Sequence, residues 1–177
     1  MQETVEKEYS PEYVSRLFDR MASTYGVLNY ISSFGFTEIW RKRCINNLDL
    51  DQDENEKIGY DLMSGMGECF SLIKDQLPNC ALTGLDISET MTNKAIENIS
   101  KKRLTKIAVQ QEDVFFNSLE SNTADFITSA FGLKTFNHAQ LQALAKEVYR
   151  LLKSNGKISF IEISIPNNSF LKPFFVF

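Results

Sequence analysis

The sequence lacks the features that mark several large classes of protein. Its 19 Lys and Arg against 23 Asp and Glu give a net charge of −4, so it lacks the basic surface of a nucleic-acid binder. Its cysteines, Cys44, Cys69 and Cys80, contain no CxxC pair and fit neither a zinc site nor a disulfide framework. No apolar run approaches the roughly 18 residues of a membrane helix. The acidic start MQETVEKEYS is unlike a signal peptide. We therefore expect a cytoplasmic protein without a metal or nucleic acid, able to contact a membrane only at its surface.

What is present is a helical N-terminal segment followed by alternating strands and helices. Ser10, Pro11 and Glu12 form a helix start, and a second helix is predicted from Thr37. The polar run DLDQDENEK then separates residues 1–50 from a core, 51–166, and an apolar tail, 167–177. Within the core, strands are predicted at 58–63, 81–86, 106–109, 124–130 and 157–165, and helices at 68–76, 89–101 and 140–153.

This alternation predicts an α/β fold with a parallel sheet of about five strands and helices on both faces. The last helix should end with Lys153, because Asn155 and Gly156 form a stop signal. In such sheets ligands bind at the carboxyl ends of the strands. We therefore look for functional residues just after each predicted strand.

The stretch DLMSGMGECF, residues 61–70, places a Gly-x-Gly turn after the first predicted strand. A dinucleotide site would use GxGxxG, whose third Gly lets helix and strand pack closely. Here Phe70 holds that third position. Glu68 would also place a carboxylate where a pyrophosphate binds, which is repulsive. The turn therefore disfavours NAD.

Three acids near successive strand ends favour S-adenosylmethionine, which has no phosphate and carries ammonium and sulfonium charges. Asp61 is placed to bind the amino group. Asp86 ends the second strand, where its carboxylate can accept hydrogen bonds from both ribose hydroxyls. Asp113 follows the third strand and can face the adenine amino group.

Each of these features alone has a plainer explanation. A lone Gly-x-Gly occurs in simple tight turns, and an Asp at a strand end is often the N-cap of the next helix. Ser88 is better placed as that cap, which leaves Asp86 for a ligand. The sole histidine, His138, follows Asn137 at a helix start, where a cap or surface role is favoured over catalysis. The Gly-x-Gly turn and the three acids occur together, in the order and at the strand ends expected of an S-adenosylmethionine site. This joint pattern supports the interpretation.

Longer segments make the pattern more specific. They are YVSRLFDRMASTYGVLNYISSFGFTEIWRK (13–42), DLMSGMGE (61–68), GLDISETM (84–91), SAFGLKTF (129–136), RLLKSNGKI (150–158) and IEISIP (161–166). In these the chain resembles the C-methyltransferases of menaquinone and ubiquinone biosynthesis, which have the Rossmann-like class I fold that uses S-adenosylmethionine. The first segment is the most specific, since the glycine turn alone indicates only a methyltransferase.

The resemblance implies a cofactor site and a substrate pocket. The implied cofactor-binding residues are Asp61, Ser64, Gly65, Met66, Gly67, Asp86, Ile87, Asp113, Val114 and Ala130. The N-terminal segment would act as a helical lid with Tyr25 and Asn29 facing the substrate, and Phe131 and Lys134 are candidates for the same pocket. The implied reaction transfers a methyl group to an electron-rich ring carbon of a prenylated hydroquinol. No catalytic residue is assigned.

Two other functions stay open: an O-, N- or C-methyltransferase of specialised metabolism, and a truncated, non-catalytic binding partner. The family continues past the fifth strand with a helix and a strand hairpin, whereas this sequence stops at NNSFLKPFFVF. The fifth strand would then be an apolar edge. We expect either a truncated form or a homodimer that covers this strand and the tail.

Overall fold

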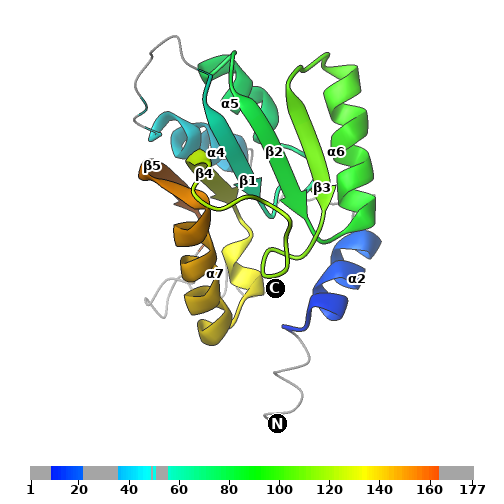
Figure 1. The fold of residues 1–177 in the computed structure, drawn as a ribbon. Helices are drawn as coiled ribbons and strands as arrows, with labels where there is room; N and C mark the ends of the chain where they lie inside the picture. Colours follow the sequence, from blue (N-terminus) through cyan, green and yellow to red (C-terminus); the bar gives the residue numbers. More distant parts are fainter. Residues whose placement is uncertain (1–8, 22–35, 49, 51–55, 164–177) are drawn as a thin grey trace, which may run out of the picture.

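The computed structural model describes residues 9–21, 36–48, 50 and 56–163 (Figure 1). Its centre is a sheet of five parallel strands in the order β3-β2-β1-β4-β5. The strands are β1 (Ile58–Leu62), β2 (Ala81–Asp86), β3 (Ile107–Gln111), β4 (Ala124–Ala130) and β5 (Leu152–Ile161). The predicted α/β fold with a parallel five-stranded sheet is thus confirmed. Tyr25, Asn29 and the tail at 167–177 lie outside the described residues.

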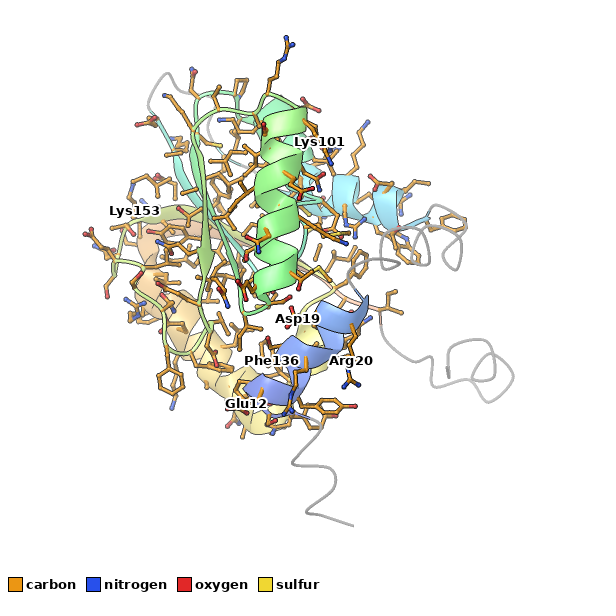
Figure 2. The ribbon with its side chains drawn as sticks, turned by 90° about the vertical axis from the view of Figure 1, so that its right-hand side faces the viewer. Glu12, Asp19, Arg20, Lys101, Phe136 and Lys153 are labelled. Carbon is orange, nitrogen blue, oxygen red and sulfur yellow. The ribbon has the colours of Figure 1, made fainter. Side chains whose placement is uncertain are left out.

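The helices are α2 (Pro11–Met21), α4 (Phe36–Asn46), α5 (Phe70–Gln76), α6 (Glu89–Lys101) and α7 (His138–Leu151), with a 3-10 turn at Leu133–Thr135. Helices α4, α5 and α6 cover one face of this sheet and α7 the other, whereas α2 lies beyond the carboxyl ends of the strands. One apolar cluster joins α4, α5 and α6 to the sheet, with Ile45, Phe70 and Phe126 at its centre. A second cluster packs α7 on the opposite face through Leu144 and Leu151. Figure 2 shows α4 and α6 on one side of the strands and α7 on the other.

Helix starts agree with the sequence more closely than strand ends do. Ser88 is the N-cap of α6, and its Oγ accepts the backbone N–H of Met91 at 3.1 Å, as predicted. Asn137 caps α7 in a capping box with Gln140, and His138 is exposed.

None of the helices in the described part of the chain has the length and apolar character needed to span a membrane.

The predicted turn before β5 is wrong in detail. Helix α7 ends at Leu151 rather than at Lys153, because Leu152 already has an extended backbone and pairs with Ala124 on β4. The register then shifts, so that the next pair joins Phe126 to Lys157. The polar residues expected to form a separate loop are therefore an irregularity within β5.

Candidate functional site

A cavity of about 940 Å³, its open mouth included, lies at the carboxyl ends of the strands. From β1 the chain continues to β2 and β3 on one side and later to β4 and β5 on the other. The crevice at such a switch point is where open α/β sheets bind ligands. Helix α2 lies beyond these strand ends (Figure 1), and Pro11, Val14 and Phe18 line the cavity.

The turn after β1 follows a backbone path that suits glycine. Gly65 has a φ of 55° and Gly67 a φ of 73°, and between them the turn is closed by a hydrogen bond from Gly67 N to Ser64 O at 3.0 Å. Ser64 and Gly65 line the cavity. The Ser64 hydroxyl is buried and has no hydrogen-bond partner among the described residues. A buried hydroxyl left unpaired is costly, which makes Ser64 a candidate contact for a ligand in the cavity that it lines.

Gly67 should be the residue of this turn that tolerates substitution least. A Cβ there would collide with the buried ring of Phe70, whereas at Gly65 it would meet only the flexible end of Glu68, at 3.0 Å. Both positions pay about 1–2 kcal/mol for the left-handed backbone. We therefore expect Gly67→Ala to lower the free energy of unfolding by roughly 1–3 kcal/mol more than Gly65→Ala, measured by urea denaturation. Equal losses would contradict this packing.

Asp61 is the most deeply buried acid of the site. It lies on β1 at 2% exposure, and one carboxylate oxygen accepts a hydrogen bond from the Thr128 hydroxyl at 2.6 Å. Burial raises the pKa of Asp61 to about 7, aided by the nearby Glu68 carboxylate and opposed by the Thr128 hydrogen bond. An acid held at such a cost to folding is a functional-site candidate.

Asp86 joins the end of β2 to the glycine turn. Its two carboxylate oxygens accept the backbone N–H groups of Gly65 at 2.8 Å and of Ser88 at 3.0 Å. Burial raises the pKa of Asp86 to about 6, although these two hydrogen bonds act to lower it. The carboxylate is thus fixed in place at the cavity wall, with lone pairs left for a ligand.

The other predicted cofactor residues divide into two groups. Ile87, Asp113, Val114 and Ala130 line the cavity, whereas Met66 and Gly67 do not. The Asp113 carboxylate also accepts the backbone N–H of Phe115 at 2.9 Å and so shapes the turn after β3. Most of the predicted set is therefore brought together around one cavity.

The opposite part of the cavity is aromatic. Phe115 and Phe136 meet edge to face, with ring centroids 5.2 Å apart, and Phe131 has a left-handed backbone with a φ of 68°. Such strain in a bulky residue is typical of functional sites. Lys134, by contrast, is exposed and does not line the cavity, and its backbone N–H donates to Glu162 at 2.9 Å. Of the predicted substrate residues within the described chain, only Phe131 faces the cavity.

Two residues to which the sequence analysis gave no role, Arg41 and Asp19, are brought to this site by the structure, and Arg41 pairs with Glu68 there. Arg41 on α4 and Glu68 both line the cavity, and their side chains approach to 3.4 Å. Asp19 lies on α2, near the start of α6 in Figure 2. Arg41 and Asp19 come from the N-terminal segment. No spacing in the sequence signals these contacts, because they join parts of the chain far apart in the sequence.

Helix α2 is held over the cavity at both of its ends. The Asp19 carboxylate accepts hydrogen bonds from the Ser88 hydroxyl at 2.6 Å and the Thr90 backbone N–H at 3.3 Å. The Ser88 hydrogen bond is the main reason that the pKa of Asp19 is lowered. Before the other end of α2, the carbonyl of Tyr9 accepts a hydrogen bond from the Gln140 side chain at 2.9 Å. These bonds connect α2 to the starts of both α6 and α7.

We expect Asp19→Asn to loosen α2 without unfolding the core. Replacing a charged acceptor weakens both bonds to α6 by about 1–2 kcal/mol in sum, so amide hydrogen exchange in α2 should be roughly tenfold faster. Glu12→Gln is the matched control, since it removes the same charge from the exposed side of α2 (Figure 2). Equal exchange in the two variants would contradict the role of Asp19.

The fold and the site together define a class. The order of the strands, their parallel direction and the position of the cavity at their carboxyl ends are those of the Rossmann-like fold of class I methyltransferases. A SAM-dependent methyltransferase from Aquifex aeolicus is similar in structure, with a TM-score of 0.62 and 20% identity over 73% of this chain and 66% of that one.

The sequence comparison is more specific. Residues 3–177 match the model of the ubiE/COQ5 methyltransferase family, and the chain belongs to that family. It is 33% identical to the demethylmenaquinone methyltransferase of Bacteroides fragilis over 93% of this chain, and 33% identical to that of Thermotoga maritima over 88%. The chain spans 65% and 64% of the lengths of these two relatives. The resemblance found in the sequence is confirmed.

Proposed function

We propose that the chain is an S-adenosylmethionine-dependent methyltransferase acting on a ring carbon of a hydrophobic, quinol-like aromatic acceptor. The observation that carries this proposal is the charge of the cavity. Within the described part of the chain its lining contains one cationic side chain, Arg41, and five acids: Asp61, Glu68, Asp86, Glu112 and Asp113. Such a wall attracts a ligand that carries ammonium and sulfonium charges and repels a pyrophosphate.

The residues around the glycine turn fit this ligand. Asp61 would bind its ammonium group, and the Ser64 hydroxyl, which has no partner within the described part of the chain, would donate to its carboxylate. Asp86, fixed by two backbone N–H groups, would accept the ribose hydroxyls. Ile87 and Val114 would enclose the adenine, with Asp113 near its amino group. When bound, S-adenosylmethionine supplies an electrophilic methyl group.

The turn also argues against a dinucleotide. One Glu68 oxygen accepts the backbone N–H of Met66 at 3.0 Å. That N–H would otherwise be available to a phosphate, and the carboxylate occupies the same wall of the cavity as Gly65. A pyrophosphate would therefore meet a negative charge and one fewer donor.

The aromatic part of the cavity suits a planar, greasy acceptor. Phe115, Phe131 and Phe136 would contact its ring, and Phe18 and Val14 on α2 would exclude water from above. Both curated relatives named above are demethylmenaquinone methyltransferases, which supports a quinol carbon as the methylated atom. Roles for Tyr25, Asn29 and Lys134 stay predictions, as do membrane-surface contact and a homodimer through β5 and the tail.

Positioning would supply much of the rate. Holding the acceptor carbon close to the methyl donor converts an encounter in solution into a reaction within one complex. Helix α2, held over the cavity, would exclude water and strengthen the electrostatic attraction between the acids and the donor.

The proposal is tested by incubating the chain with methyl-labelled S-adenosylmethionine and a panel of acceptors. The panel should hold a demethylated naphthoquinol, a benzoquinol and a phenol of similar size. Mass spectrometry should find label on a ring carbon of a quinol and none on the phenol oxygen. Label on oxygen would favour a methyltransferase of specialised metabolism. Binding of the donor without transfer to any acceptor would favour a non-catalytic partner.

A further inference from the structure

Arg41 is the cationic residue of the cavity wall, and the N-terminal segment supplies it. Its side chain is 8% exposed and lies 3.4 Å from the carboxylates of both Glu38 and Glu68. The guanidinium also packs over the ring of Phe131, with its central carbon 5.4 Å from the ring centroid. A buried guanidinium with these partners is held in one position.

These partners lie on both sides of the switch point. Glu68 belongs to the glycine turn after β1, and its second oxygen accepts the backbone N–H of Met66 at 3.0 Å. Phe131 follows β4 and has the left-handed backbone noted above. Arg41 therefore links α4 to the two loops that form the cavity wall.

The same cation also acts electrostatically on Asp61, the buried acid of β1. The charged groups that act on Asp61 are the carboxylates of Glu68 and Asp86, which disfavour its ionisation, and Arg41, which favours it. The thiols of Cys44 and Cys69 also lie near, and burial raises the pKa of both, so they stay neutral. Within the described residues, Arg41 is thus the one cation that offsets several negative charges around Asp61.

We propose that Arg41 is a positioning residue of the cofactor site: it holds Glu68 against the glycine turn and fixes a positive charge in the cavity wall that also carries Asp61, the acid that would bind the ammonium group of the ligand. This inference rests on the proposed function for the identity of the ligand. The position of the guanidinium between Glu68 and Phe131 carries it. Because Arg41 belongs to α4, the cofactor site is fully formed only when α4 is packed against the core.

The first test measures the affinity for S-adenosylhomocysteine by calorimetry between pH 6 and 8.5. This compound has the same amino acid and nucleoside groups and transfers no methyl group. For the unmodified chain, affinity should rise with pH as Asp61 ionises, with a midpoint near its pKa of about 7. Arg41→Met should move the midpoint upward by roughly one pH unit and so lower the affinity at pH 7 about fivefold, because the ionised fraction of Asp61 there falls from about one half to about one eleventh.

Two further variants separate charge from packing. Arg41→Lys keeps the charge and should restore the midpoint. Arg41→Met combined with Glu68→Gln removes one charge of each sign and should return the midpoint to that of the unmodified chain or slightly below it, because Glu68 acts on the pKa of Asp61 more strongly than Arg41 does. Arg43→Met, an exposed position on the same helix, is the matched control and should change neither value. A uniform loss of affinity at every pH, with no shift in midpoint, would overturn the proposal.

A measurement without ligand separates this inference from the proposed function. The carboxyl carbon of Asp61 can be followed by NMR as a function of pH, with Asp61→Asn assigning the signal. Arg41→Met should move its midpoint upward, whether or not the compound binds. If S-adenosylhomocysteine fails to bind the unmodified chain, the proposed function fails. If the Asp61 midpoint is the same with and without Arg41, the role of Arg41 fails.

Discussion

Asp61→Asn is expected to make the unliganded chain more stable at pH 8 and to remove its affinity for S-adenosylmethionine. The carboxylate is buried on β1, and burial is the main cause that raises its pKa to about 7. An amide of the same shape carries no charge to desolvate, and it can still accept the hydrogen bond from the Thr128 hydroxyl. The gain in the free energy of unfolding should be on the order of 2–4 kcal/mol.

The sign of this effect follows from proton linkage. The pKa of Asp61 is higher in the folded chain than in the unfolded chain. Between these two pKa values the folded state therefore binds more protons than the unfolded state. The contribution of Asp61 to stability is therefore fully present below pH 3.8 and is lost as the pH rises through about 7. Above that range the unmodified chain bears the whole free-energy cost of burying the Asp61 charge, whereas Asp61→Asn has no charge to bury.

Denaturant unfolding at pH 5 and pH 8 measures this difference. Asp125→Asn is the control, because that acid binds Lys153 at 2.8 Å and the backbone N–H of Ile58 at 2.8 Å. Its replacement should lower stability and leave ligand binding unchanged. A destabilised Asp61→Asn that still binds S-adenosylmethionine would show that Asp61 is structural.

Asp86→Ala is expected to weaken S-adenosylmethionine binding by at least a hundredfold. The substitution removes the acceptor for the ribose hydroxyls, and charge-assisted hydrogen bonds of this kind contribute about 1.5–3 kcal/mol each. It also leaves the backbone N–H groups of Gly65 and Ser88 without their partner. The glycine turn would then lose one of its connections to the end of β2 and keep the backbone hydrogen bond from Ser64 N to Leu85 O at 2.9 Å.

Titration calorimetry of the variant gives the affinity, and far-UV circular dichroism shows whether the sheet remains. Asp75→Ala is the matched control, since this acid is exposed on α5 and far along the helix from the turn. It should bind as the unmodified chain does. Loss of affinity in both variants to the same extent would mean that net charge, not the Asp86 contact, governs binding.

The sequence was most informative where function and fold place residues in a fixed order. Apolar segments separated by helical patterns predicted the exact bounds of β2, β4 and α6. Parallel strands bring their carboxyl ends to one edge of the sheet. The sequence alone therefore predicted that Asp61, Asp86 and Asp113 lie around one cavity. The Gly-x-Gly turn follows β1, so its place at the same edge of the sheet was predictable as well.

The sequence was least informative at edges and across long separations. Strand β3 extends to Gln111, two residues beyond its apolar part, because backbone pairing with β2 does not require apolar side chains. Arg41 reaches Glu68, and Asp19 reaches Ser88, only because α4 and α2 pack against the core. Lys134 is adjacent to the cavity in sequence, yet the 3-10 turn exposes it.

In the proposed function, the cavity at the glycine turn binds S-adenosylmethionine and excludes a dinucleotide. The direct measurement is calorimetric titration of the chain with S-adenosylmethionine and, separately, with NADH. We predict micromolar binding of S-adenosylmethionine, lost in Asp86→Ala, and no heat of binding with NADH. Binding of NADH, or of neither compound, would contradict the assignment of this cavity.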